Sequence, residues 1–246
     1  MSSESDFIVP DWPAPARVTA LSTVRTGGVS TAPWDSLNLG GHVADDPGSV
    51  ERNRRRLAER VGIPLSGFRF LNQIHGTRIV EFPSERVIDA DGCATSRPGV
   101  PCLIMAADCL PVLFCNRVGT RVAAAHAGWR GLCGGVLERA VAKFEHPGDV
   151  MAWLGPAIGP NQFEVGAEVR DAFVKQTPEA DSAFLPSSNP GHFLADLYDL
   201  ARQRLASAGV TDVYGGHWCT FSDSDRFFSY RRDGVTGRMA SLIFIE

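Results

Sequence analysis

The chain has 246 residues, of which 44% are hydrophobic and 21% are charged, and its formal net charge is −4 at pH 7. This composition is typical of a globular protein long enough to bury a core without disulfides or a structural metal, and the negative charge argues against a general nucleic-acid-binding protein. The segment MSSESDFIVPDWPAP has neither the basic start nor the apolar stretch of a signal peptide, and no apolar run reaches the roughly 18 residues of a membrane span.

The first predicted elements are an arm, a strand and a helix. Residues 1–16 are polar and rich in proline, so we expect a loose N-terminal arm. A strand is predicted within 17–30, where it runs into a glycine turn. A helix is predicted over 45–62, because Asp46 can cap its N-terminus and Gly62 can end it.

The next three segments are apolar, and each is interrupted by polar residues or glycines. Residues 68–82 predict two strand pieces broken at a His-Gly pair. Residues 99–116 hold two apolar runs without alternation, which indicates two strands buried on both faces. Residues 120–144 predict a strand, a glycine turn and a helix.

The C-terminal part continues to alternate strands and helices. A strand with a loop is predicted over 149–159, and helices are predicted over 166–176 and 192–209. Residues 212–220 and 240–246 are late strand candidates. Strands and helices mix throughout, and no repeat or linker separates them, so we expect one domain of the α/β (α+β) class.

Three of the interrupted apolar segments end in a residue that can bind a metal. These residues are His75 in NQIHG, Cys109 in AADCLP and His126 in AAHAGWRG. Strand ends are places where segments distant in sequence converge on a site. Two imidazoles and one thiolate suit Zn²⁺ with its fourth position open, which is the arrangement of a catalytic rather than a structural zinc. Such an ion can polarise an oxygen or acidify a bound water.

Each of these residues also has a simpler interpretation. A histidine at a strand end is more often a structural residue bonded to the backbone, and a cysteine in an apolar run is more often a small core residue. The other cysteines take the core interpretation, except for one that the sequence leaves undecided; they are Cys93, Cys102, Cys115 and Cys133, with Cys219 undecided. No pair has CxxC spacing, and we expect a reduced, cytoplasmic protein.

Eight motifs in order carry a resemblance to a known family. They are VRTGGVS, SLNLGGHVADDP, NQIHG, DADG, AADCLPVL, AHAGWRG, IGPNQFEVGAEV and FFSYRRDGVTGRMASLI. Together they resemble the YfiH-like family, long labelled multicopper polyphenol oxidase or laccase-domain proteins, from about Thr23 to the end of the sequence.

The resemblance implies a fold, an activity and a ligand set. The family is described as purine nucleoside phosphorylases with added adenosine deaminase activity, and it implies a single-domain mixed-sheet sandwich with flanking helices over 17–246 and a cytosolic setting. The zinc ligands of the family lie in the motifs NQxHG, ADC and HAGWRG, which here fall on His75, Cys109 and His126. The same three residues are those selected by their chemistry.

Phosphorolysis of a nucleoside requires a site for phosphate, for which arginine is the natural ligand because its planar fork matches two oxygens. The candidates are Arg54, Arg130, Arg231 and Arg232, together with Asn38 in a glycine loop that could reach substrate. Alternatively, Arg54 belongs to a solvated charge run, Arg231 and Arg232 form an ion pair with Asp233 in a turn, and Asn38 serves turn chemistry.

Other polar and aromatic residues have weaker claims. His42 shares the glycine loop of Asn38 and could reach a ribose or base. Asp91 and Asp108 could orient a histidine or carry a proton, although Asp108 should point away from its neighbour Cys109 on a regular strand. Phe228 and Tyr230 could stack on a purine, but aromatic residues are more often part of the core.

Three rival functions remain open. A multicopper oxidase needs a histidine-rich cluster, whereas this chain has six histidines and no His-x-His, although a single copper could occupy the His–Cys–His set. Cys109 could instead be the nucleophile of a cysteine hydrolase, and some relatives are described as peptidoglycan editing factors. A non-catalytic, zinc-stabilised protein would need a fourth ligand such as His42 or His217.

The preferred interpretation is a monomeric zinc enzyme that takes purine nucleosides and phosphate, with no nucleic-acid or membrane partner and no named proton carrier for deamination.

Overall fold

The structure is a computed structural model that describes residues 7–82 and 89–246. The strands are β1 (Phe7–Ile8), β2 (Val18–Thr23), β3 (Ile79–Glu81), β4 (Gly92–Thr95), β5 (Cys102–Ala106), β6 (Leu110–Asn116), β7 (Val122–Ala127), β8 (Val150–Leu154), β9 (Glu164–Gly166), β10 (Phe184–Pro186), β11 (His192–Ala195), β12 (Asp212–Gly215) and β13 (Met239–Ile245). The helices are α1 (Pro47–Val61), α2 (Trp129–Gly134), α3 (Val136–Val141), α4 (Ala167–Val174), α5 (Leu197–Ser207) and α6 (Tyr230–Asp233), with 3-10 turns at Leu65–Gly67, Pro147–Asp149 and Pro178–Ala183.

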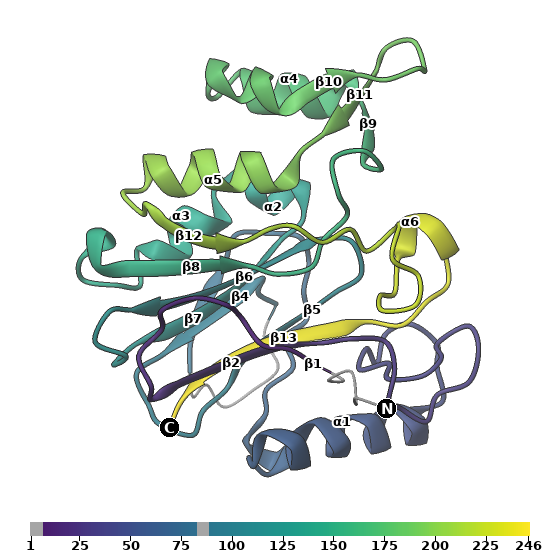
Figure 1. The fold of residues 1–246 in the computed structure, drawn as a ribbon, viewed down its shortest axis with the longest axis vertical. Helices are drawn as coiled ribbons and strands as arrows, with labels where there is room; N and C mark the ends of the chain where they lie inside the picture. Colours follow the sequence, from purple (N-terminus) through teal and green to yellow (C-terminus); the bar gives the residue numbers. More distant parts are fainter. Residues whose placement is uncertain (1–6, 83–88) are drawn as a thin grey trace.

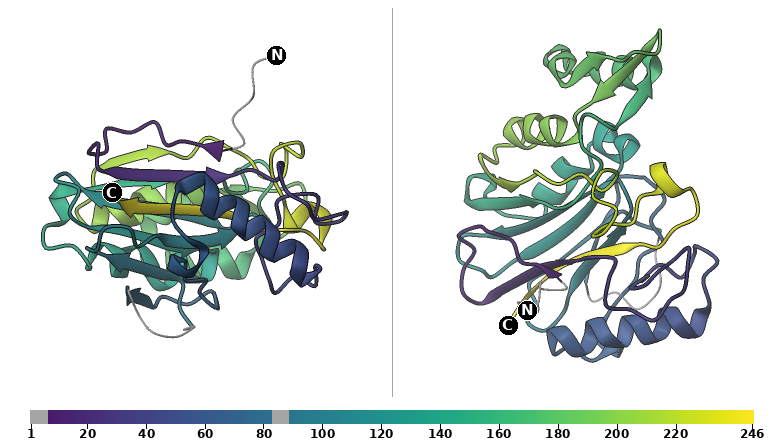
Figure 2. Two further views of the ribbon diagram at one scale, coloured as in Figure 1. Left: turned by 90° about the horizontal axis from the view of Figure 1, so that it is seen from below. Right: turned by 45° about the vertical axis from the view of Figure 1, so that its right-hand side comes forward.

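The described elements stack in four layers (Figure 1). A sheet of order β1-β2-β13-β5 packs on a mixed sheet of order β12-β8-β6-β7-β4-β3. Helix α1 covers the outer face of the first sheet, and α2, α3 and α5 cover the outer face of the second (Figure 2). The expected mixed-sheet α/β sandwich with flanking helices is confirmed.

Strict alternation of side chains builds the layers. In β6, Val112 and Phe114 face the helices, whereas Leu113 and Cys115 face the other sheet. The same alternation in β13 sends Ile243 between the sheets and its neighbours toward α1. Both sheets are therefore buried on both faces, which explains why their strands are apolar without a polar period.

Helix α1 forms where the sequence places its caps. The Asp46 carboxylate accepts a hydrogen bond from the Ser49 N–H at 2.8 Å, and Gly62 closes the helix at φ 71°. Val50 and Leu57 lie one heptad apart on the buried face. The predicted helix over 45–62 is confirmed, as are the strands at β2, β5, β6, β7, β8, β12 and β13 and the helix at α4.

Several elements differ from the sequence expectations. Only the second strand piece predicted within 68–82 forms, as β3; the first is irregular chain whose one β-bridge joins Asn72 to Asp89 among the described residues. The helix predicted after β7 is divided at Gly135, which adopts φ 95°. The start of the helix predicted over 192–209 is strand β11, and α5 begins only at Leu197. Strands β4, β9 and β10 were not predicted.

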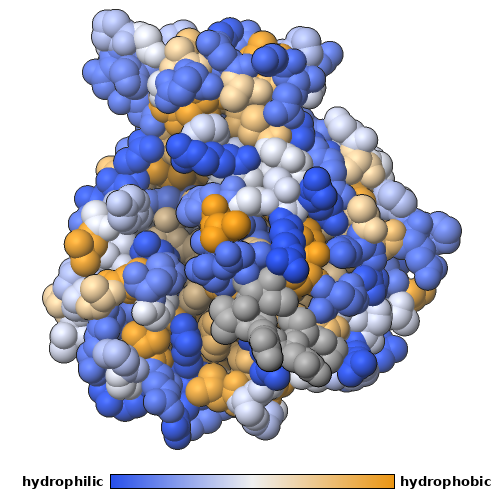
Figure 3. Space-filling view, turned by 180° about the vertical axis from the view of Figure 1, so that it is seen from behind, coloured by the Kyte–Doolittle hydropathy of each residue, from blue (hydrophilic) through white to orange (hydrophobic). Residues whose placement is uncertain are grey.

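A small lobe stands off the rest of the molecule (Figures 2 and 3). It consists of the sheet β10-β11-β9 together with α4 and the turn Pro178–Ala183. Phe173 and Phe184 pack at 5.9 Å between ring centroids inside it. The lobe and the helices α2, α3 and α5 share one hydrophobic core with the six-stranded sheet.

The structure describes residues 7–16 of the predicted N-terminal arm. Residues 1–6 lie outside the described residues, whereas Phe7–Ile8 pairs antiparallel with β2, so this part of the arm is attached to a sheet. The helices of the described residues include none with the length and apolarity needed to cross a membrane.

Candidate metal centre

The strand register of the second sheet assembles the site. In the antiparallel pair β4–β7, Gly92 lies opposite Ala125, so Asp91 just before β4 reaches His126. In the pair β6–β7, Leu110 lies opposite Ala127, so Cys109 just before β6 lies close to the end of β7. Asp91, Cys109 and His126, which are far apart in sequence, are therefore neighbours at one end of the strands β4, β6 and β7.

His75, Cys109 and His126 come together at this end of the strands. One potential ligand atom from each lies within 4.8 Å of the others, and this is the metal-capable group found among the residues that the structure describes. Cys109 Sγ is 3.7 Å from His75 Nε2, and the two imidazole rings lie 4.9 Å apart at 74°. His126 is buried, Cys109 is half-buried and His75 is exposed, so the group has one side open to solvent.

Asp91 organises both histidines. Its carboxylate is fully buried and accepts hydrogen bonds from the His75 N–H at 2.9 Å and from the Gly76 N–H at 2.6 Å. The same carboxylate lies 2.9 Å from His126 Nδ1, and because a carboxylate accepts, Nδ1 carries the proton. Nε2 of His126 does not face Asp91, so in the neutral imidazole it is the unprotonated nitrogen and the one left to bind a metal. Burial favours the neutral acid, but the bonds from His126 and Gly76 outweigh it and lower the pKa of Asp91.

Unusual backbone conformations surround the group. His75 has φ 60° and Asp108 has φ 88°, values that side-chain-bearing residues seldom adopt. Gly128, directly before α2, has to be glycine, because a Cβ there would lie 2.8 Å from His75 Cδ2 and 3.0 Å from Cys109 Sγ. The chain is strained and closely packed where the three donors meet.

The side chains of the group interact electrostatically. Burial opposes ionisation of Cys109, but the positive charge of His126 prevails and lowers the pKa of the thiol to about 6. Burial likewise opposes protonation of His126, but the Cys109 thiolate and then Asp91 raise the pKa of His126 to about 9. The cysteine is thus stabilised as a thiolate, the form that binds metals and attacks electrophiles.

Asp108 is turned away from the three donors. Its Oδ1 accepts a hydrogen bond from Thr220 Oγ1 at 2.6 Å, and its Oδ2 accepts one from the Arg231 N–H at 2.7 Å. Asp108 therefore ties the segment that contains α6 to the edge of the sheet.

The four arginines expected to bind phosphate occupy different environments. Arg130 is exposed at the start of α2, with its guanidinium 4.3 Å from the centre of the Trp129 ring. Arg231 is exposed and donates to the Glu164 carbonyl. Arg232 donates to the carbonyls of Thr220, Phe221 and Phe227 and to Asp233, so its guanidinium holds the loop before α6 together.

Arg54 and Asn38 lie on the other side of the site. Arg54 is half-buried on α1, donates to the Leu39 carbonyl at 3.0 Å, and stacks on Phe70. Asn38 is fully buried, and its amide bonds Gly40, Asp45 and the N–H of Arg238, so it holds the glycine loop in place. Arg238 was not among the sequence candidates; its one signal is an arginine directly before an apolar strand.

The remaining candidate residues differ in how far their side chains are exposed to solvent. Phe228 is fully buried beneath Gly237 and belongs to the core between the sheets, so its ring is not available to a base. Tyr230 is 61% exposed with its ring centre 5.8 Å from the Arg238 guanidinium, and Ile74, which precedes His75 in the chain, is 56% exposed, so both present apolar surface to solvent. His42 and His217 are not part of the metal-capable group of the described residues.

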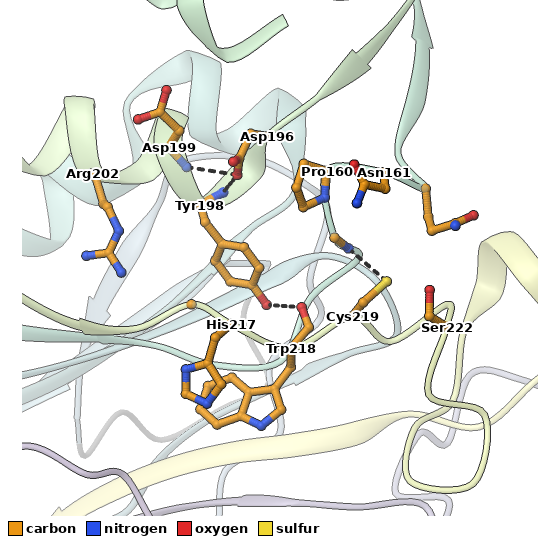
Figure 4. A pocket seen from close by; sticks show the side chains of 13 residues that line it. Pro160, Asn161, Asp196, Tyr198, Asp199, Arg202, His217, Trp218, Cys219 and Ser222 are labelled. Carbon is orange, nitrogen blue, oxygen red and sulfur yellow. Dashed lines mark hydrogen bonds between the residues drawn. The ribbon is translucent and has the colours of Figure 1, made fainter. Parts of the chain in front are cut away.

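A separate cavity of about 550 Å³ lies near the beginning of α5 (Figure 4). Its lining includes Asp196, Arg202 and Trp218 and none of the three metal-capable residues. Cys219 borders it and accepts a hydrogen bond from the Gly159 N–H at 3.2 Å. Burial raises the pKa of this thiol, but the Ser222 hydroxyl and nearby N–H groups lower it overall.

Comparison with known sequences shows close relatives along the whole chain. The family described as multi-copper polyphenol oxidoreductase laccase matches residues 19–246. A Pseudomonas aeruginosa protein named purine nucleoside phosphorylase is 61% identical over 98% of both chains. The protein of Escherichia coli named purine nucleoside phosphorylase YfiH is 52% identical over 98% of this chain and 99% of its own length.

Solved structures show the same fold. A Neisseria meningitidis protein superposes with a TM-score of 0.93 at 52% identity, covering 98% of this chain and all of its own. YlmD from Geobacillus stearothermophilus has a TM-score of 0.93 at 34% identity, covering all of this chain and 98% of its own.

Proposed function

The chain belongs to the family described as multi-copper polyphenol oxidoreductase laccases, and on that premise we propose that it is a metal-dependent purine nucleoside phosphorylase. Its relatives that are 52% and 61% identical along their whole length carry that name. The observation that supports the activity in this chain is the convergence of two imidazoles and a thiolate on one open-sided group.

The donor set fits zinc. His75, Cys109 and the unprotonated Nε2 of His126 supply three ligands that zinc accepts, and the open side leaves a fourth position. When bound, zinc supplies a Lewis acid for an oxygen of the substrate. A multicopper cluster needs more histidines than the two that meet here, and all six histidines of the chain lie in its described part.

The reaction joins a nucleoside and phosphate. An oxygen of hydrogen phosphate forms a bond to C1′ of the ribose while the bond from C1′ to the purine nitrogen breaks. The electron pair of that bond goes to the purine nitrogen, and the proton of hydrogen phosphate ends on the purine. The side chains of this protein position both reactants: the exposed faces of Ile74 and Tyr230 offer apolar contacts for the base, and arginines offer charge for phosphate. Arg130 and Arg231 are exposed and Arg54 is half-buried, whereas the guanidinium of Arg232 already bonds the carbonyls of its loop.

The test is direct. Protein purified without added metal is analysed for zinc and copper and is then incubated with adenosine or inosine and phosphate. We expect stoichiometric zinc and formation of free base with ribose 1-phosphate, and we expect both to be lost in Cys109→Ala. Absence of a bound metal together with absence of phosphate-dependent base release contradicts the proposal. Inosine formed from adenosine would add the deaminase activity.

A cysteine hydrolase is the second candidate, because the stabilised thiolate of Cys109 is also a nucleophile. A metal-bound thiolate is not free to attack, so the two functions respond oppositely to a chelator. Phosphorolysis stops when zinc is removed, whereas a hydrolase that uses Cys109 is fully active and becomes sensitive to iodoacetamide. The half-buried thiol of Cys219 serves as an internal reference for alkylation, since the chelator leaves its surroundings unchanged.

The proposal also covers the cellular compartment and the oligomeric state of the enzyme. All six cysteines are free, as in a reducing compartment, so we place the enzyme in the cytoplasm. We propose that it acts as a monomer on small molecules, because each donor of the site comes from a single chain. Size-exclusion chromatography with light scattering tests the oligomeric state.

A further inference from the structure

We propose that inorganic phosphate binds between Arg54, Arg238 and His42, in a subsite built on the glycine loop 39–42. The proposal rests on the proposed phosphorylase function and assigns its second substrate to particular residues. Two of them, Arg238 and His42, lie outside the arginines that the sequence singled out for phosphate.

The backbone of one residue, Leu39, contacts both arginines. The N–H of Leu39 donates to the Arg238 carbonyl at 3.1 Å, and the carbonyl of Leu39 accepts from Arg54 Nε at 3.0 Å. Helix α1 and the beginning of β13 are thereby joined through a single buried residue. The two arginines therefore stand beside the same loop, one on α1 and the other directly before β13.

The glycines of the loop make room for both side chains. A Cβ at Gly40 would lie 2.8 Å from Arg238 Cγ, and a Cβ at Gly41 would lie 3.4 Å from Arg54 Nη2. The loop therefore passes directly between the two arginines and ends at His42, which is exposed to solvent. An anion can reach this position from outside and meet donors on two sides.

Two half-buried arginines side by side need a counter-charge. Arg121, which is also half-buried, pairs with Glu81 at 2.7 Å. Among the described residues, no carboxylate lies within 4.0 Å of Arg54 or Arg238 to form such a pair. Burial lowers the pKa of both arginines, which reflects the cost of holding these charges away from water. A phosphate dianion supplies the missing charge, and two guanidinium forks match its oxygens.

The subsite adjoins the metal centre. Met239 pairs with Ala106, so Arg238 lies beside the bend that leads through Asp108 to Cys109. The charges of Cys109 and Asp108 act on Arg238 and raise its pKa against the effect of burial. Phosphate held here is next to the group where the nucleoside is proposed to bind.

His42 contributes a hydrogen bond rather than a charge. Burial and then the charges of Arg238 and Arg54 lower the pKa of His42, so its imidazole is neutral near pH 7. A neutral imidazole has one N–H to donate to a phosphate oxygen.

Arg130 and Arg231 lack this arrangement. Arg130 is exposed, and its guanidinium lies over the ring of Trp129. Among the described residues, no second arginine flanks the same loop. Arg231 is exposed and donates to the Glu164 carbonyl. Arg130 and Arg231 are the alternatives that the experiment must exclude.

Arg238 also donates to carbonyls, from Nη1 to Thr236 and Gly237, and Arg54 donates from Nε to Leu39. The remaining nitrogens of these two half-buried side chains are therefore the donors that we assign to phosphate.

Steady-state kinetics with varied phosphate tests the assignment. We expect Arg238→Met and Arg54→Met each to raise the KM for phosphate at least about tenfold, because each removes a charged hydrogen bond to the anion. The KM for inosine and the zinc content should change less than about twofold. Arg55→Met is the matched control, since Arg55 is exposed on the same helix and Glu51 is its one salt-bridge partner among residues 7–82 and 89–246.

The kinetic results distinguish a wrong phosphate subsite from a wrong phosphorylase function. If the phosphate KM is unchanged in both variants, or rises only in Arg130→Met or Arg231→Met, the subsite is wrong while phosphorolysis stands. If the wild-type protein forms no ribose 1-phosphate, the function fails, and calorimetry with inorganic phosphate on the zinc-loaded protein still tests the subsite. Should Arg238→Met not fold, Arg238→Lys keeps the stem against Gly40 and loses the fork, and its phosphate KM then decides.

Discussion

At the scale of single residues, the site depends most on a group that touches no substrate. Asp91 receives N–H groups from the loop that carries His75 and bonds the ring of His126, so one carboxylate fixes two of the three donors. Partners of this kind orient metal ligands and set which imidazole nitrogen is free. The sequence offered Asp91 only as one of two acidic candidates, because the register that brings it to His126 involves strand β4, which was not predicted.

Replacing Asp91 should weaken metal binding without removing a ligand. In Asp91→Asn the amide presents an NH₂ where the carboxylate accepted from Gly76, so the loop of His75 loses its anchor. We expect zinc affinity to fall roughly 10- to 100-fold, measured by competition with a chromogenic chelator. Asp89→Asn is the control, since Asp89 is exposed and, within the described part of the chain, its carboxylate bonds only Asn72. An unchanged zinc affinity in Asp91→Asn would show that Asp91 does not position the ligands.

At the scale of elements, helix α2 closes the site by lying unusually near the loop of His75. Gly128 and Gly131 provide this approach: a Cβ at Gly131 would meet the Gly76 carbonyl oxygen at 2.7 Å. Alanines along β7 allow the helices behind the sheet to pack closely as well. The motif HAGWRG thus combines a ligand with the small residues that its neighbours require.

A single methyl group on α2 should therefore disturb the metal centre. We expect Gly131→Ala to destabilise the fold by about 1–3 kcal/mol in urea denaturation and to lower zinc content, because backbone and not a flexible side chain stands in the way. Gly148→Ala, where a Cβ would meet no atom within 4 Å, should leave both unchanged. Equal stability and zinc content in the two variants would contradict the close approach of α2.

The elements also show what the sequence can and cannot predict. Helix α1 was predictable because Asp46 and Gly62 mark its ends within the local sequence. Strands β4 and β9 are only a few residues long, and they exist because neighbouring strands pair with them, which no local pattern encodes. The same holds for the site: the three donors were visible as residue types, whereas Arg238 became visible only when the loop 39–42 joined it to Arg54.

At the scale of the whole molecule, the metal centre links segments that are far apart in the chain. His75 precedes β3, Cys109 precedes β6 and His126 lies in β7, so the complete donor set exists only when the second sheet is folded. A ligand that binds the folded state alone stabilises it by mass action.

Metal removal should accordingly lower the melting temperature. With zinc at about a thousand times its dissociation constant the gain is about 4 kcal/mol, which for a chain of this length corresponds to a shift on the order of 10 °C. Differential scanning calorimetry with and without a strong chelator measures it. Cys109→Ala should show no such shift, and a wild-type protein insensitive to the chelator would indicate that no metal contributes to its stability.

The pairing of β2 with β13 has a consequence for the time course of folding. Ser22 and Ser241 bond each other across a separation of 219 residues, whereas β6 and β7 are joined by a short turn. Contacts between distant residues form late, because closing a long loop costs chain entropy before any contact compensates for it. Cys109 and His126 lie at β6 and β7, which that short turn joins, while Arg238 enters its place only with β13. A refolding chain should thus acquire affinity for metal before it acquires affinity for phosphate.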